Sequence, residues 1–200
     1  MKGSLIIVGF FILGVIFGRA GWIEIGNIGF DVSFIALMLL MFCVGISVGN
    51  DMNSLRSLKK LSPRLLLLPL VTITGTLFGC FLISLMIPSR DLTEVLAIGS
   101  GFGYYSLSSI FITQYKGPEL GTVALLANIS REIITLLGAP FLAWIAGPLA
   151  PITSGGATTM DTTLPIISKV SGSRFVILSI YHGFVVDFSV PFLVTFFCSL

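Results

Sequence analysis

The sequence predicts an all-α integral membrane protein with five full transmembrane helices and two Gly-rich discontinuous helices that are either re-entrant or broken. Three observations support this prediction: an apolar composition, apolar runs long enough to cross a bilayer, and two interruptions rich in Gly, Ser and Thr. The 200 residues are 55% hydrophobic and 10% charged, with a mean hydropathy of +1.06. Because soluble domains carry about 25% charged residues, this composition excludes an ordinary water-soluble domain.

Length and charge limit the organisation further. A helical span uses about 20 residues, so the chain has no room for a separate soluble domain, and we expect a single transmembrane domain over residues 1–200. The net charge of +2 is too small to favour a nucleic-acid partner. The three cysteines lie singly in apolar segments without the spacing of a metal or redox site. We therefore expect no metal and no organic cofactor.

Three spans are evident in the first part of the chain, over residues 4–19, 32–49 and 65–87. The connection over residues 50–64 is the most basic in the sequence, with four Lys or Arg residues against a single aspartate. Basic connections stay in the cytoplasm. The N-terminus is then cytoplasmic as well, and the connection that follows the third span lies outside.

The pattern changes after residue 94. Residues 95–114 and 152–168 are apolar segments that are each interrupted by a Gly-rich run. The helix predicted between them, over residues 119–147, is about 42 Å long at 1.5 Å per residue, and a last span covers residues 175–198. The C-terminus lies outside whether both interrupted segments re-enter or both cross, so charge alone does not separate the two arrangements.

The two interruptions are costly, because backbone groups freed at membrane depth cannot form hydrogen bonds with lipid. Discontinuous helices of this kind build the substrate and ion sites of secondary transporters, whereas glycine-rich stripes also serve close helix packing. Threonines and an aspartate in the second interruption add polarity that packing does not need, which favours the transporter. The motifs of intramembrane serine and aspartyl proteases are missing from the sequence, so we do not expect an enzyme.

One face of the helix over residues 119–147 is small and polar. At about 100° per residue, a single arc collects Gly121, Ala124, Asn128, Arg131, Glu132, Thr135 and Ala139. Glu132 lies near the middle of the span, where a charge costs roughly 2.5–3.5 kcal/mol. It is therefore a candidate for binding a cation or a proton. The alternative is a structural ion pair of Arg131 with Glu132 or Asp161.

Asp161 supplies a second acid, in the second interruption, and Thr162 follows it. Two carboxylates at membrane depth suit a cationic substrate, and either can hold a proton when the substrate is absent. Arg131 or the N-termini of the half-helices could receive a carboxylate of the substrate. This division suits a basic amino acid, which carries two cationic groups and one anionic group.

Other polar residues give weaker signals. His182 could relay protons near neutral pH or be a packing residue whose nitrogens are satisfied by the protein, and Asp187 in the same span could face a polar cavity or a partner. Tyr105, Ser106 and Ser108 in the first interruption could line a binding site, although for the serines a structural cap is an equal alternative.

Taken together, these motifs resemble the bacterial lysine exporter (LysO-type) family, from about residue 5 to the end of the chain. The resemblance rests on five ordered motifs. They are 100–108, Gly117-Pro118, Arg131-Glu132, 156–165, and His182-Gly183-Phe184 with Val190-Pro191.

The resemblance implies an exporter of L-lysine and its toxic analogue thialysine in the bacterial cytoplasmic (inner) membrane. It also implies exchange for protons, with sodium as another possible coupling ion, and it assigns the two essential intramembrane acids of the family to Glu132 and Asp161. The alternatives are a coupled transporter of another small solute on a similar scaffold, and a non-transporting channel or assembly subunit.

The chain departs from the family pattern in two ways. Full-length members have an additional N-terminal block of roughly three spans, so the chain resembles the larger C-terminal portion of a split exporter. A small membrane subunit, a second copy of the chain, or both are then expected as partners within the bilayer. Asn128 also stands where the family pattern has an aspartate, and Asp187 where it has a neutral polar residue, so an acid has moved between helices.

Overall fold

The computed structural model describes residues 63–200 and eight single positions before them, Leu13, Ile16, Phe17, Arg19, Ala20, Ile35, Leu39 and Phe42. The predicted spans over residues 4–19 and 32–49 lie outside the described residues, apart from those positions. Residues 51–200 form a compact unit of their own, and it is described here by itself. The single transmembrane domain expected over residues 1–200 stays a prediction.

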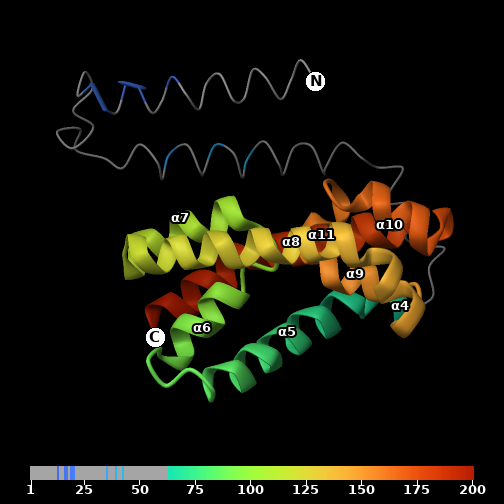
Figure 1. Ribbon diagram of the computed structural model, residues 1–200, viewed down its shortest axis with the longest axis horizontal. Helices are drawn as coiled ribbons and strands as arrows, with labels where there is room; N and C mark the ends of the chain where they lie inside the picture. The colour runs from blue at the N-terminus through green and yellow to red at the C-terminus, as the bar shows by residue number, and fades with distance from the viewer. Residues whose placement is uncertain are drawn as a thin grey trace. The chain divides into compact units, whose positions relative to one another are not determined.

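The described part of the chain is helical throughout and contains no strand (Figure 1). Its elements in chain order are α4 (Pro63–Leu66), α5 (Leu68–Ser84), α6 (Leu92–Gly99), α7 (Tyr105–Lys116), α8 (Pro118–Ala146), α9 (Ala150–Gly155), the 3-10 helix η2 (Gly156–Met160), α10 (Leu164–Ser171), the 3-10 helix η3 (Ser173–Phe175) and α11 (Val176–Ser199).

Three helical stretches of the described residues are long and apolar enough to cross a membrane. They are Pro63–Ser84, Pro118–Ala146 and Ser173–Ser199, with mean hydropathies of 2.2, 1.5 and 1.7. They lie at the predicted spans over 65–87, 119–147 and 175–198, so the described part of the chain has the all-helical character and the several apolar helices expected of a multi-pass membrane protein. The full count of five spans stays a prediction.

The helices end at both Gly-rich interruptions. α6 ends at Gly99 and α7 begins at Tyr105, and between them Phe102 and Gly103 have φ angles of 46° and 94°. α9 ends at Gly155, and Gly156 follows with a φ of 61°. At 1.5 Å per residue, α6 and α9 are only about 12 Å and 9 Å long, far less than the thickness of a bilayer.

The segment from α6 to α7, the first hairpin, starts and ends at one face of the unit. The Arg90 side chain, in the connection before α6, donates a hydrogen bond to Glu119 at the start of α8 and forms an ion pair of 3.8 Å with Glu94. The hydrogen bond and the charge of Glu119 raise the pKa of Arg90 above its ordinary value. The contact ties the entry of the first hairpin to the residues that follow its exit.

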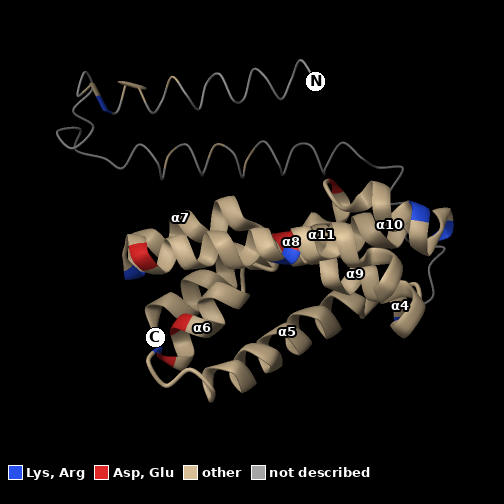
Figure 2. Cartoon of the chain, viewed as in Figure 1, with Lys and Arg blue, Asp and Glu red and all other residues tan. Residues whose placement is uncertain are grey.

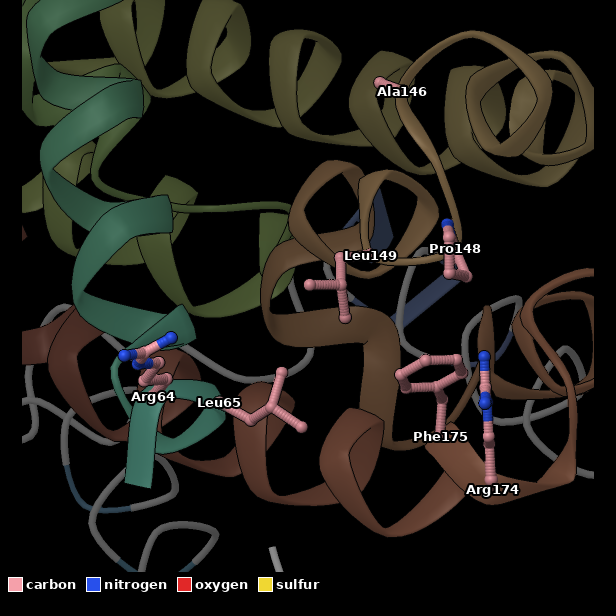
Figure 3. Close-up of a pocket in the computed structure, with 7 residues that line it drawn as sticks. All are labelled: Arg64, Leu65, Ala146, Pro148, Leu149, Arg174 and Phe175. Atoms are coloured by element: carbon pink, nitrogen blue, oxygen red, sulfur yellow. The ribbon is translucent and has the colours of Figure 1, made fainter. Parts of the chain in front are cut away.

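The segment from α9 to α10, the second hairpin, starts and ends at the other face. A pocket of about 590 Å³ there brings together α4, the end of α8, the residues just before α9, and η3 (Figure 3). Its lining residues are Arg64, Leu65, Ala146, Pro148, Leu149, Arg174 and Phe175. Figure 1 accordingly shows α6 and α7 at one end of α8 and α9 and α10 at the other.

The polar face predicted on α8 is its buried face. Buried residues of α8 include Gly121, Ala124, Asn128, Thr135 and Ala139. Leu126, Ile133, Ile134, Leu137 and Phe141 are exposed, as expected of side chains that face lipid. Charged residues gather toward the ends of the unit, and one acidic and one basic residue lie near the middle of α8 (Figure 2).

Candidate functional site

The two hairpins contact each other at their tips. The backbone N–H of Ala157 donates to the carbonyl of Phe102 over 2.9 Å, and Phe102 is completely buried. A methyl group at Gly156 would lie far inside van der Waals contact with the same carbonyl, and one at Gly103 would lie 3.2 Å from the Gly155 carbonyl. The glycines therefore allow two backbones to approach closely, and the bond between them satisfies groups that lipid cannot.

Asn128 of α8 holds the tip of the first hairpin. Its Oδ1 accepts from the backbone N–H of Gly103 over 2.8 Å, and its Nδ2 donates to the carbonyls of Ile98 over 3.1 Å and Ala124 over 2.9 Å. A longer contact of 3.5 Å joins Nδ2 to the hydroxyl of Ser108. Both donors of the amide are thus occupied by protein groups, so the geometry gives Asn128 a positioning role.

Arg131 holds the second hairpin. Its Nε donates to the Ser154 carbonyl over 2.9 Å and its Nη2 to the Thr153 carbonyl over 3.0 Å, near the C-terminus of α9. Its Nη1 donates to the Thr76 hydroxyl of α5 over 3.2 Å, and the guanidinium lies 5.9 Å from the ring centre of Phe102. In the described part of the chain Arg131 forms no ion pair with Glu132 or Asp161, so the alternative of a structural ion pair is not what the structure contains.

A shallow pocket lies beside Arg131, between α5 and α9. It has a volume of about 410 Å³. Its polar lining consists of Thr72, Thr76, Thr153 and Ser154, and three of these four residues accept hydrogen bonds from Arg131. The guanidinium has five N–H groups and uses three of them in these bonds, which leaves donors for a further anionic group.

His182 lies at the junction of α5, η2 and α11. It is completely buried, and its two ring nitrogens pair with the hydroxyls of Thr72 over 2.8 Å and Thr159 over 3.1 Å. Of the two interpretations from the sequence, this geometry favours the satisfied packing residue.

The two predicted acids are not joined to each other. Glu132 is half-buried and makes no hydrogen bond or ion pair with any described residue. Asp161 is exposed, and its Oδ1 accepts from the backbone N–H of Thr162 over 2.5 Å. Both carboxylates thus keep free acceptor sites, although on different elements.

The remaining residues that the sequence singled out occupy varied positions. Ser108 is fully buried and donates to the Tyr104 carbonyl one turn earlier over 2.9 Å, whereas the start of α7 has no side-chain cap hydrogen bond. Tyr105 is half-buried, whereas Ser106 and Thr162 are exposed.

A second acidic neighbourhood, formed by Asp161, Asp187 and Tyr104, is a feature that sequence reasoning did not assemble. Asp187 of α11 is only 3% exposed, and its Oδ1 has no hydrogen-bond partner among the described residues. Met160, which precedes Asp161, packs against α11 one helical turn from Asp187, since a Cβ at Gly183 would lie 2.6 Å from the Met160 backbone nitrogen. Tyr104 stands at the start of α7, which also packs on α11. The sequence feature that could have pointed to this neighbourhood was Asp187 itself, a charged residue inside an apolar span.

Comparison with known proteins shows which family the sequence of this chain matches. A family model described as lysine exporter LysO matches residues 8–198. The chain is 34% identical over 196 residues to a protein of Escherichia coli (strain K12) named lysine exporter LysO. It is also 34% identical over 191 residues to a protein of Haemophilus influenzae named putative lysine exporter. No solved structure matches the chain.

The two relatives differ in how much of their length the chain spans. The alignment with the Escherichia coli protein covers 98% of this chain and 64% of that protein. The alignment with the Haemophilus influenzae protein covers 94% of both.

Proposed function

The chain belongs to the lysine exporter LysO family, and we propose that it exports L-lysine and thialysine across the bacterial inner membrane. The observation that carries the proposal is the meeting of two hairpin tips at Phe102 and Ala157, with Arg131 beside them, in a chain of this family. Broken helices that meet inside a bundle are how transporters offer backbone and side-chain groups to a substrate at membrane depth.

The charges of lysine suit the groups that the site leaves free. Lysine and thialysine each carry two ammonium groups and one carboxylate. Glu132 and Asp161 keep free acceptor sites for an ammonium group, and Arg131, which is bonded to Thr76 and Ser154 of the neighbouring pocket, has unused N–H groups for the carboxylate. Arg131 suits this task because a guanidinium binds a carboxylate in a forked geometry while still holding other acceptors.

Proton antiport is the coupling that we propose, with sodium as the alternative ion. A carboxylate inside a membrane is costly when it is charged and empty. It therefore binds either a proton or a cationic substrate, and alternation between the two couples their movements in opposite directions.

The hairpins re-enter rather than cross in the arrangement that we propose. The contact of Arg90 with Glu119 supports an exit of the first hairpin at the face where it enters, and the pocket shared by Leu149 and Arg174 supports the same for the second. With the basic connection over residues 50–64 in the cytoplasm, the C-terminus lies outside. A small membrane subunit or a second copy of the chain stays an expected partner.

Reconstituted transport tests the function. Purified protein in vesicles, as the chain alone and together with any small membrane protein that co-purifies with it, should give saturable export of labelled lysine that thialysine inhibits and an opposing proton gradient stimulates. Glu132→Gln should abolish this flux without lowering the melting temperature, because the Glu132 carboxylate has no described partner. Asp91→Asn, which changes an exposed carboxylate without a hydrogen bond, should transport normally.

Two results would contradict the proposal. Flux that does not saturate and needs no gradient would indicate a channel. Absence of lysine flux in every folded preparation would exclude lysine as the substrate and direct attention to other cationic solutes.

A further inference from the structure

Asp187 is a buried carboxylate whose Oδ1 has no hydrogen-bond partner among the described residues. It lies in α11, which is long and apolar enough to span the membrane. Its side chain is 3% exposed, and Oδ1 accepts no hydrogen bond in the described part of the chain. Buried carboxylates are normally paired or hydrogen-bonded, because an unpaired charge in an apolar setting is strongly unfavourable. A group in this state needs a bound proton or another cation.

Packing places the part of α11 that carries Asp187 against the tip of the second hairpin and along the helices of the first. Gly183 lies one turn before it on the same side of α11, and a Cβ at Gly183 would be 2.6 Å from the backbone nitrogen of Met160 and 2.9 Å from the carbonyl of Ala157. α11 also packs along α6 and α7 of the first hairpin. Asp187 therefore lies on the face of α11 that packs against the two hairpins.

Titratable residues of both hairpins lie near the face of α11 that carries Asp187. Asp161 follows Met160, whose backbone nitrogen would lie 2.6 Å from a Cβ at Gly183. Tyr104 and Tyr105 stand at the start of α7, which packs on α11. Asp161 is exposed whereas Asp187 is buried. This pairing gives a buried acid an exposed acidic neighbour through which a proton can reach it.

We infer that the proton bound at Asp161 in the transport cycle passes to Asp187, which holds it away from the solvent until release. The inference rests on the proposed function. A proton is the cation that a single buried oxygen can bind without further ligands, whereas sodium needs several oxygens around it. In the step, a proton moves from solvent to the Asp161 carboxylate and from there to an oxygen of Asp187, leaving Asp161 ionised; release reverses the same transfers.

The test separates proton coupling from lysine binding in reconstituted vesicles. Lysine–lysine exchange across the membrane requires no net proton movement, whereas accumulation driven by a pH gradient does. Asp187→Asn should retain the exchange rate of the wild-type protein but lose gradient-driven accumulation, with the proton flux measured by an internal pH dye falling to the level of protein-free vesicles. Asp91→Asn is the matched control and should retain both activities.

Stability gives a second readout. Because Oδ1 of Asp187 has no partner to lose, Asp187→Asn should melt at the wild-type temperature or above it. A clear fall in melting temperature, or failure to fold, would identify a structural bond to Asp187 and overturn the inference.

The outcomes also distinguish this inference from the proposed function. If Asp187→Asn accumulates lysine against a pH gradient like the wild type, the inference is wrong and the exporter remains. If the wild-type protein transports lysine with sodium instead of protons, the inference is equally wrong. If the wild-type protein transports no lysine in either assay, the proposed function fails and the inference fails with it.

Discussion

Arg131 connects three elements through one planar group, and this geometry gives a specific prediction. Its three nitrogens donate to Thr76 and to the carbonyls of Thr153 and Ser154. Lysine is a single point charge and cannot reach these acceptors together. Arg131→Lys should therefore lower stability by about 2–3 kcal/mol, as expected for lost hydrogen bonds to a charged group, and lysine flux should fall sharply.

The melting temperature in detergent and the flux in vesicles measure these two effects. Arg174→Lys is the control, since Arg174 is exposed and its contact is the face of the neighbouring Phe175 ring. An Arg131→Lys protein with wild-type stability would show that the three bonds contribute little.

At the scale of single residues, periodicity predicted a face well but did not predict hydrogen-bond partners. The buried arc of α8 follows from its spacing, because small and polar side chains recur where helices must approach closely. Asn128 lies on that arc, yet its role depends on the backbone of Gly103, 25 residues away along the chain. Asp187 and Tyr104 stand on different elements, and no local pattern relates them.

At the scale of elements, Gly156 is the residue that allows the two hairpins to come into contact. Its φ of 61° disfavours any residue with a Cβ, and an added methyl group would collide with the Phe102 carbonyl. Gly156→Ala should therefore separate the tips, remove the Ala157–Phe102 hydrogen bond and abolish transport.

Gly138→Ala provides the matched control in α8. Nothing lies within 4 Å of a Cβ at Gly138, and alanine in a helix interior is more favourable than glycine by about 0.5–1 kcal/mol. This variant should keep transport and melt at the same or a higher temperature. Equal behaviour of the two variants, measured by flux and thermal unfolding, would argue against a close crossing.

The positions of the two helix breaks were predictable, because runs of Gly, Ser and Thr inside apolar segments interrupt helices. α6 and α9 do end within them. The contact between the interruptions was not predictable, because it depends on how deeply each hairpin enters the bundle. That depth is set by packing of α11 on η2 and on α6 and α7, and α6 and α7 are far from α11 in the sequence.

At the scale of the whole molecule, the sequence leaves two arrangements open and the contacts of the described unit favour one. Charge counting places the C-terminus outside in both. The arrangements differ in the position of residues 116–118: re-entry keeps them on the side of residue 89, and crossing moves them to the other side. The bond from Arg90 to Glu119 is the contact that favours re-entry.

Thiol labelling distinguishes the two arrangements directly. In a protein whose three native cysteines are replaced by serine, single cysteines are placed at Ser89, Lys116, Pro148 and Ser173, all of which are exposed. A membrane-impermeant reagent added to intact cells should label the Ser89→Cys and Lys116→Cys proteins. It should label the Pro148→Cys and Ser173→Cys proteins only after the inner membrane is opened, and denatured samples give the maximum labelling of each. Labelling of Ser89→Cys and Lys116→Cys from opposite sides would mean that the first hairpin crosses the membrane, and the contact between Arg90 and Glu119 could not then form within one chain.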